Sequence, residues 1–201
     1  MIKFFVLPLF AYLLGSIPWG LVLTRLFTSA DIRHEGSGNI GATNVARIAG
    51  PTLGILTLVG DLLKGAIPVW IAVVLATPNS LWGEFYISLV VLAAFSGHLY
   101  PVYMRFKKGC KGVATAAGCF AVISPVAFMV AILVFIMFVC WLNRVAVASL
   151  AAAAVLPVAV WKATGSGVLT GCAVVTAMLI YFRHTDNIKR LLNGIEPVIW
   201  K

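Results

Sequence analysis

One polar stretch in this chain combines residue types that could bind an anion. Residues 35–47 read Glu-Gly-Ser-Gly-Asn-Ile-Gly-Ala-Thr-Asn-Val-Ala-Arg and lie between two apolar segments. Glycines leave backbone N–H groups open to a ligand, and small polar side chains add hydrogen-bond partners, so the stretch suits a phosphate. A solvated loop is the alternative, but polar groups at membrane depth are usually functional. The candidate binding residues are Gly36, Ser37, Gly38, Asn39, Gly41, Thr43, Asn44 and Arg47.

A second basic stretch has the same character. Residues 105–115 read Arg-Phe-Lys-Lys-Gly-Cys-Lys-Gly-Val-Ala-Thr. An apolar run follows, so we expect a helix N-terminus, whose open N–H groups and dipole favour a bound anion. Lys111 lies closest to that start and is the strongest candidate. A lipid-binding anchor is the alternative, and the spacing is not that of a Walker motif. The candidates are Lys107, Lys108, Gly109, Lys111, Gly112 and Thr115.

Several ionisable residues lie inside or next to apolar segments. Asp61 and Lys64 are three residues apart, so they share a helix face, and pairing lowers the cost of burying both. We expect this pair to brace the site. His98 is a candidate substrate-binding residue, with a structural histidine as the alternative. His184 and Asn187 are also three apart, and histidine titrates near neutral pH, which suits proton transfer.

The remaining reactive residue types form no recognisable constellation. The three histidines are far apart and the four cysteines contain no Cys-x-x-Cys pair, so no metal site is expected. Lysines beside Cys110 favour the thiolate. A nucleophilic cysteine also needs a base, however, and none is close in the sequence. We therefore expect Cys110 not to act as a nucleophile.

Composition then defines what must position these residues. The chain is 62% apolar with a mean hydropathy of +1.04, which excludes an ordinary soluble domain. We expect an all-α polytopic membrane protein forming a single integral membrane domain over residues 1–201. The net charge of +9 is interpreted as a topology signal, so no nucleic-acid partner is expected.

Seven apolar segments are candidates for transmembrane helices. With the N-terminus outside, twelve of the 15 Lys and Arg residues fall on the inner side and two on the outer side, with Lys64 inside a span. The positive-inside rule therefore predicts a cytoplasmic C-terminus, and it puts both glycine-rich stretches and His184 on the cytoplasmic side. A six-span protein with a re-entrant fourth segment is the alternative. The segments are 4–23, 53–75, 82–103, 113–123, 126–142, 145–161 and 168–182.

Five motifs in a fixed order give the chain a family resemblance. They are Gly36-Ser-Gly-Asn-Ile-Gly-Ala-Thr-Asn44, Gly60-Asp-Leu-Leu-Lys-Gly65, Gly97-His-Leu-Tyr-Pro101, Lys111-Gly-Val-Ala-Thr115 and His184-x-x-Asn-Ile188. With them the chain resembles the bacterial acyl-phosphate:glycerol-3-phosphate acyltransferases of the inner membrane, from about Gly15 to Trp200. The resemblance departs at Ile40, where the family often has proline. It departs again at Cys110, which replaces the second glycine of a Lys-Gly-Gly-Lys-Gly motif, so that Lys107 is extra to that motif.

The resemblance implies a fold and a reaction. The fold would have seven helices and an active site facing the cytoplasm. An acyl group would pass from acyl phosphate to the 1-hydroxyl of glycerol 3-phosphate, giving lysophosphatidic acid and phosphate. No cofactor is expected, and the partners would be the two substrates and membrane lipids.

A mechanism without an acyl-enzyme follows from the donor, since acyl phosphate already carries a good leaving group. One phosphate would be bound by Arg47 with the Ser37–Thr43 stretch and the other by Lys111. Asn39, His184 and Asn187 would orient the acceptor or polarise the carbonyl. Either the leaving phosphate or His184 would accept the hydroxyl proton. A phosphate-ester transporter is the alternative, but no repeat between the two halves is visible.

Overall fold

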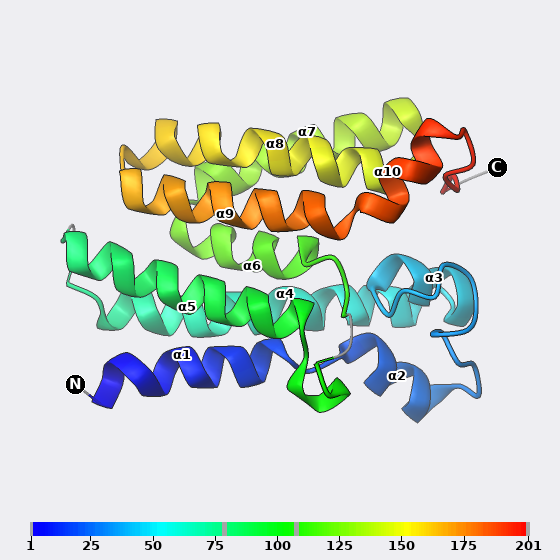
Figure 1. Cartoon of the computed structure of the whole chain (residues 1–201), viewed down its shortest axis with the longest axis horizontal. Helices are drawn as coiled ribbons and strands as arrows, with labels where there is room; N and C mark the ends of the chain where they lie inside the picture. Colours follow the sequence, from blue (N-terminus) through cyan, green and yellow to red (C-terminus); the bar gives the residue numbers. More distant parts are fainter. Residues whose placement is uncertain (1, 78–79, 107–108, 200–201) are drawn as a thin grey trace. The chain divides into compact units, whose positions relative to one another are not determined.

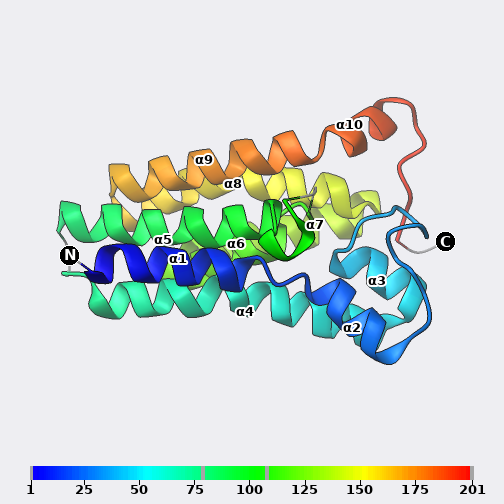
Figure 2. The same ribbon diagram turned by 60° about the horizontal axis from the view of Figure 1, so that its bottom comes forward.

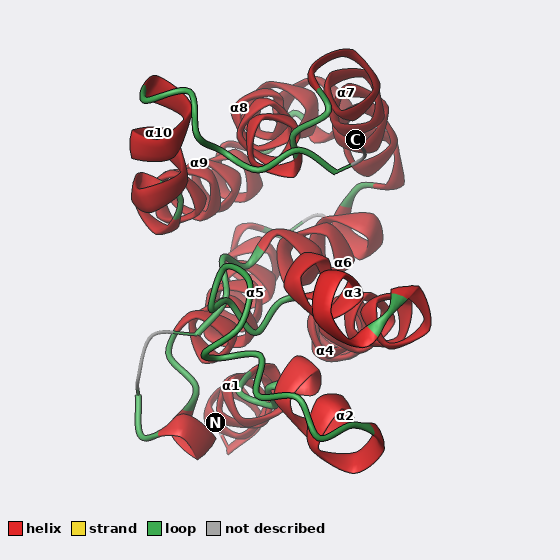
Figure 3. Cartoon of the chain, turned by 90° about the vertical axis from the view of Figure 1, so that its right-hand side faces the viewer, coloured by secondary structure: helices red, strands yellow, loops and turns green. Residues whose placement is uncertain are grey.

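The described part of the chain consists of helices joined by loops (Figures 1 and 3), as the sequence predicted. The computed structural model describes residues 2–77, 80–106 and 109–199. The helices are α1 (Ile2–Gly15), α2 (Trp19–Phe27), α3 (Ala42–Ala49), α4 (Pro51–Leu75), α5 (Leu81–Leu99), the 3-10 helix η1 (Val102–Met104), α6 (Val113–Ile123), α7 (Pro125–Leu142), α8 (Val145–Thr164), α9 (Gly167–Arg183) and α10 (Thr185–Leu192).

The chain divides into two compact units, residues 1–119 and 120–201. The single membrane domain over residues 1–201 stays a prediction. In the first unit, α1, α4 and α5 lie side by side (Figures 1 and 2), and α2 and α3 pack against α4. Glycines allow the closest approaches: a Cβ on Gly15 would clash with the backbone of Ala94, and one on Gly97 would clash with the backbone of Tyr12. Small residues bring membrane helices together in this way.

The first apolar segment is not one continuous helix. The span predicted over residues 4–23 is interrupted: α1 ends at Gly15, α2 begins at Trp19, and the two are bent by 43°. Pro18 explains the break, because proline lacks an N–H and disfavours helical backbone at the residue before it, here Ile17. The break matters because it releases backbone carbonyls from helical hydrogen bonding.

In the second unit, α8 packs between α7 and α9. The predicted boundaries at Pro125 and Asn143 are confirmed. Ser124 caps α7 by accepting a hydrogen bond from the N–H of Ala127, Pro125 occupies the first turn, and Asn143 ends α7 in the left-handed conformation at φ 53°. Serine caps and a left-handed end residue are common helix signals. The α10 helix follows α9 after a bend of 57°; the spacing of His184 and Asn187 had predicted helix here, without its bounds or the bend.

Within the described residues, four helical stretches are long and apolar enough to cross a membrane: 51–75, 81–104, 125–142 and 145–164. The number rises to six if each bent pair, α1 with α2 and α9 with α10, counts as one span. The α6 helix has the predicted bounds, but its 11 residues are fewer than the roughly 20 that a membrane crossing needs. Only 6% of the residues of α7 are buried, as expected for a helix whose surface faces lipid.

Candidate active site

Asn44 shapes the glycine-rich loop before α3. Its Oδ1 accepts a hydrogen bond from the Ser37 N–H (2.9 Å), and its Nδ2 donates to the carbonyls of Ile32 and Glu35 (both 3.1 Å). Gly36 lies against this side chain at φ +61°, and a Cβ there would clash with Asn44 Oδ1. Both N–H groups of the buried Asn44 amide are used inside the protein. We therefore infer that Asn44 positions the loop and does not itself bind a phosphate.

The loop leads into a helix N-terminus. We expected a loop through Arg47, but α3 begins at Ala42. Asn39 Oδ1 accepts the N–H of Gly41 at 2.9 Å, and the first helical hydrogen bonds come from Asn44 and Val45 to the Gly41 carbonyl. The N–H groups of Ala42 and Thr43 therefore precede the hydrogen-bonded part of the helix and are suited to an anion.

Three side chains of this segment face solvent. Ser37, Thr43 and Arg47 are all exposed, and Thr43 and Arg47 lie one turn apart on the same face of α3. The segment thus combines two hydroxyls, a guanidinium and an open helix N-terminus. This arrangement can bind a phosphate through charge-assisted hydrogen bonds.

The second glycine-rich loop lies against the first. Lys107 and Lys108 lie outside the described residues. The N–H of Gly109 donates to the Leu99 carbonyl at 2.9 Å. Gly112 has φ +85°, and a Cβ there would clash with the ring of Phe95. Lys111 is half-buried just before α6.

Cys110 is the residue that joins the two loops. It is buried in an apolar cluster with Ile40 of the first loop and with Leu21, Ile32 and Val45. Its Sγ would lie 3.5 Å from a Cβ added at Gly41. Packing at Cys110 therefore links the conformations of the two loops.

A buried ion pair lies beneath these loops. Lys64 Nζ is 2.8 Å from Asp61 Oδ1, and their side chains are only 3% and 5% exposed. Lys64 also donates to the carbonyl of Ile17 at 2.7 Å, inside the break between α1 and α2. The predicted pairing is confirmed, and the ammonium also binds the Ile17 carbonyl, which accepts a second hydrogen bond from the Trp19 N–H at 3.1 Å.

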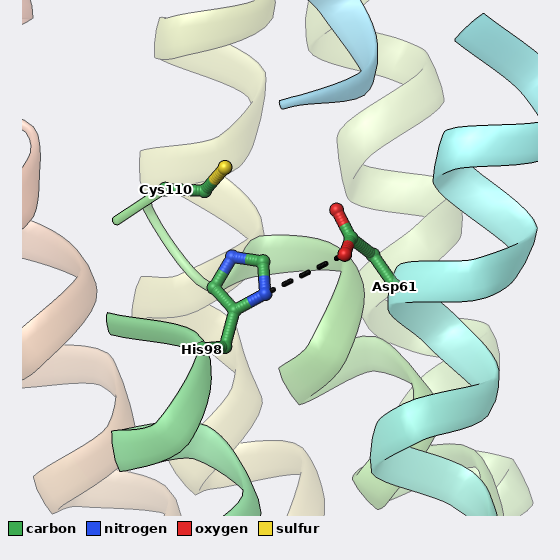
Figure 4. Close-up of side chains that lie close together, drawn as sticks. All are labelled: Asp61, His98 and Cys110. Atoms are coloured by element: carbon green, nitrogen blue, oxygen red, sulfur yellow. Dashed lines mark ion pairs between the residues drawn. The ribbon is translucent and has the colours of Figure 1, made fainter. Parts of the chain in front are cut away.

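His98 and Thr115 extend this buried cluster. Thr115 Oγ1 donates to the Asp61 backbone carbonyl at 2.8 Å and is 2.9 Å from His98 Nδ1. Because a carbonyl can only accept, the single hydroxyl proton belongs to that bond, and His98 Nδ1 must donate to Thr115. Nδ1 is also 3.7 Å from Asp61 Oδ1. The neutral ring therefore keeps its lone pair on Nε2, on the edge facing Cys110 (Figure 4).

The second unit holds the other predicted pair. His184 is buried, and its Nδ1 lies 2.8 Å from the Ile180 carbonyl, so Nδ1 donates and Nε2 carries the lone pair. Asn187 is also buried and donates through Nδ2 to Glu196 Oε1 at 2.5 Å. His184 thus has the tautomer that a proton acceptor at Nε2 requires.

Glu196 was not predicted as a site residue. Its other carboxylate oxygen binds Arg190 Nε at 2.7 Å, and its backbone carbonyl accepts from Arg144 Nε at 3.3 Å. Its signal in the sequence was weak, since Glu196 and Asp186 are both acidic residues of a basic C-terminal segment. The Glu196 carboxylate fixes the orientation of the Asn187 amide, three residues after His184 in the chain.

The fold and these clusters define an integral membrane protein whose glycine-rich loops can bind phosphate groups. A family model for glycerol-3-phosphate acyltransferase matches residues 5–194. The chain belongs to this family.

Relatives and solved structures agree with this assignment. A glycerol-3-phosphate acyltransferase of Syntrophotalea carbinolica is 49% identical over 98% of this chain and 97% of its own length. A glycerol-3-phosphate acyltransferase of Geotalea daltonii is 48% identical over 96% of this chain and 96% of its own length. The crystal structure of PlsY (YgiH), an integral membrane glycerol 3-phosphate acyltransferase, in its glycerol 3-phosphate form matches with a TM-score of 0.90 and 39% identity over 98% of this chain and 95% of that one. Its lysophosphatidic acid form matches with a TM-score of 0.88.

Proposed function

We propose that this protein transfers a fatty acyl group from acyl phosphate to the 1-hydroxyl of glycerol 3-phosphate, giving lysophosphatidic acid and inorganic phosphate. Family membership and the two PlsY forms support the acceptor and the product. The observation that carries the proposal is the segment 36–47. There, Ser37, Thr43 and Arg47 are exposed, and α3 begins within the same segment at Ala42.

The reaction needs no protein nucleophile. The acceptor hydroxyl oxygen attacks the acyl carbonyl carbon, the bond from that carbon to the phosphate oxygen breaks, and phosphate leaves. Either the leaving phosphate or Nε2 of His184 accepts the hydroxyl proton. The enzyme's task is to hold two phosphates and aim one oxygen at one carbon, and such positioning supplies effective molarities of ~10⁵–10⁸ M.

The residues divide into binding and positioning groups. Arg47 with Ser37 and Thr43 binds one phosphate, and Lys111 with the N-terminus of α6 binds the other, assisted by Lys107 and Lys108. Asn39, His184 and Asn187 orient glycerol 3-phosphate or polarise the carbonyl. The remaining members of the predicted site hold these groups in place, through loop conformation or the buried cluster: Gly36, Gly38, Gly41, Asn44, Gly109, Gly112, His98, Thr115, Asp61 and Lys64.

The membrane arrangement is part of the proposal. Seven membrane segments with the N-terminus outside put both loops and the C-terminal segment at the cytoplasmic face, as the positive-inside rule favours. They would form one integral domain in a bacterial inner membrane. A cysteine accessibility scan of intact cells tests this: new cysteines at Ser37 and Leu192, both exposed, should be protected from an impermeant reagent.

The activity is tested with purified protein in detergent, palmitoyl phosphate and glycerol 3-phosphate. Phosphate release and lysophosphatidic acid formation should each require both substrates. Counterflow of a phosphate ester in liposomes without hydrolysis would instead favour a transporter.

Arg47→Ala is the variant that tests the phosphate site. It should raise the activation free energy by about 2–3 kcal/mol, and so lower kcat/KM about 30- to 150-fold, because a charge-assisted contact to phosphate is lost. Arg33→Ala is the matched control, since Arg33 is an exposed arginine of the same loop that already binds Asp31. Equal losses in both variants would contradict a specific role for Arg47.

The direct mechanism has its own test. Ser37→Ala should slow the reaction, and mass spectrometry of wild-type protein with palmitoyl phosphate alone should show no acyl adduct. An adduct on Ser37 or Cys110 would refute direct transfer. Near-normal turnover of His184→Ala would remove His184 as the base and leave the departing phosphate in that role.

A further inference from the structure

We propose that Asp61, His98 and Cys110 form a binding site for one Zn²⁺ ion. Each residue offers one ligand atom, and these three atoms lie within 4.8 Å of one another. All three residues are buried. They come from α4, from α5 and from the loop before α6 (Figure 4), so only the folded chain brings them together. For this reason the sequence pointed to no metal site.

The histidine has the right tautomer for a metal ligand. The Thr115 hydroxyl proton is used on the Asp61 carbonyl, so Nδ1 of His98 carries the proton and donates to Thr115. This leaves the Nε2 lone pair on the side of Cys110 (Figure 4). Metal-binding histidines commonly have the other ring nitrogen held in this way by a hydrogen-bond acceptor.

The carboxylate can serve lysine and metal together. Asp61 Oδ1 binds Lys64 at 2.8 Å, while no partner of Oδ2 is recorded among the described residues. A metal on Oδ2 therefore leaves the ion pair and the Lys64 bond to Ile17 intact. With a thiolate at Cys110, the ion and its three protein ligands are neutral together, and including Lys64 the cluster carries a net charge of about +1, which is modest for a buried site.

Size and ligand type favour zinc. Zn²⁺ binds sulfur at about 2.3 Å and nitrogen or oxygen at about 2.0–2.2 Å, so two ligand atoms on one tetrahedral ion lie about 3.3–3.8 Å apart. The observed atoms need to close by about 1 Å. A small cavity of about 10 Å³ is lined by the same three side chains, which is room for about one water. A mixed sulfur, nitrogen and oxygen set suits Zn²⁺ better than Mg²⁺ or Ca²⁺. Water completes the coordination.

Zinc would also change the loops. On binding, the Cys110 thiol releases its proton to the buffer and a Zn–S bond forms. The loop around residues 109–112 is then tied to α4 and α5. Because Cys110 packs against Gly41 and Ile40, the first loop is held as well. Zn²⁺ should therefore inhibit acyl transfer, and this consequence, unlike the binding itself, rests on the proposed function.

Cobalt substitution tests the site directly. The full-length protein in detergent, stripped with chelator and kept reduced, is titrated with Co²⁺, whose bond to a thiolate gives a near-ultraviolet charge-transfer band. Wild type should show this band at one equivalent and lose it on adding Zn²⁺. Cys110→Gly and Cys110→Ser should lack it, and His98→Gln should bind at least about tenfold more weakly. Cys140→Ser, at an exposed cysteine of α7, is the matched control and should keep it.

Each outcome decides between the alternatives. A wild type without the band, a band that persists in both Cys110 variants, or a band lost in Cys140→Ser overturns the proposal. Zinc should inhibit wild type and spare Cys110→Gly. If neither protein transfers acyl groups but the cobalt band behaves as expected, the proposed function fails and the metal site stands.

Discussion

Two ion pairs in residues 1–119 have the same length and opposite surroundings. Lys64–Asp61 and Arg33–Asp31 each measure 2.8 Å. The first pair is 3% and 5% exposed, whereas the second is 45% and 42% exposed. Contact distance therefore says nothing about the difference between them, and burial must decide their energies.

The surroundings give the two pairs different tasks. An exposed pair contributes little, because water screens it and ordering two long side chains opposes it. A buried pair need not stabilise relative to apolar residues, but removing one partner leaves an uncompensated charge. Lys64 in addition holds the Ile17 carbonyl in the break between α1 and α2. The buried pair thus makes a helix break tolerable, while the exposed pair only restrains a loop.

Lys64→Met should produce the largest effect on stability. It leaves the Asp61 carboxylate and the Ile17 carbonyl buried without the ammonium. We expect a loss of about 3–5 kcal/mol in the free energy of unfolding, seen as a fall in Tm on the order of 10 °C in detergent.

The double variant Asp61→Leu with Lys64→Met is the control for that loss. It removes both charges, so much of the lost stability should return. Restored stability with restored activity would mean that the pair only braces the site. If the double variant were less stable than Lys64→Met alone, charge burial would not be the cause.

The next largest loss of stability is expected from removing a neutral buried side chain, Asn44. Asn44→Ala removes three hydrogen bonds to the backbone of the first loop. We expect a loss of about 2–3 kcal/mol in the free energy of unfolding. Buried polar groups left unpaired cost about 1–3 kcal/mol each, but some of the loop's backbone groups can form hydrogen bonds with water instead. Thermal unfolding measures the loss. Asn44→Asp puts a buried carboxylate against the carbonyls of Ile32 and Glu35, so it should be no more stable than Asn44→Ala, and a clearly more stable Asn44→Asp would mean that the two Nδ2 bonds contribute little.

An ion pair of intermediate exposure lies in the second unit. Glu196 is 7% exposed and Arg190 34% exposed, and they are 2.7 Å apart. Glu196→Gln should cost about 1–2 kcal/mol, less than breaking the fully buried pair, because water screens the Arg190 side. The Tm change measures this loss. A fall in kcat measured well below the Tm of the variant, where it is still folded, would support the role of Glu196 in orienting Asn187. A loss of stability as large as that of Lys64→Met would contradict the ordering of the pairs by exposure.

Local signals explain which parts of the fold were predictable. The Asp61–Lys64 pair and the limits of α6 to α9 follow from spacing, proline and capping residues, which act within a few positions of the chain. The break at Ile17 was missed because apolar composition on both sides hid the effect of Pro18. The α3 helix was missed because it is short and polar, and α10 was anticipated only through the spacing of His184 and Asn187.

The candidate site divides in the same way. Glycines and cations marked the two loops, because single residue types suffice to suggest anion binding. The inner contacts of Asn44, the tautomer of His98 and the clamp at Glu196 depend on partners that the fold supplies. Cys110 and His98 are neighbours only through tertiary structure, so linear spacing could not predict a base or a metal ligand beside the thiol.

The exposed pair should give the smallest effect. Asp31→Asn removes the carboxylate that accepts from Arg33 and leaves a side chain of nearly the same shape. Since both partners are surrounded by water, Tm at pH 7 should be indistinguishable from that of wild type, and activity should be unchanged. Thermal unfolding of the two proteins in the same detergent measures this, and a fall matching that of Glu196→Gln would contradict the comparison.

The pH dependence of this small effect has a definite sign. The hydrogen bonds from the Arg33 side chain and backbone hold the pKa of Asp31 well below its usual range. The pair's contribution is therefore fully present above the unfolded-state pKa of about 3.9, and it is lost as the pH falls toward the lower folded-state pKa. Any difference in Tm between wild type and Asp31→Asn should shrink in acid. It should also shrink in 1 M salt, where the Debye length is only about 3 Å. His34 Nε2 also lies 3.8 Å from Asp31 Oδ2, so a difference that grows in acid would mean that His34, once protonated, contributes more than Arg33.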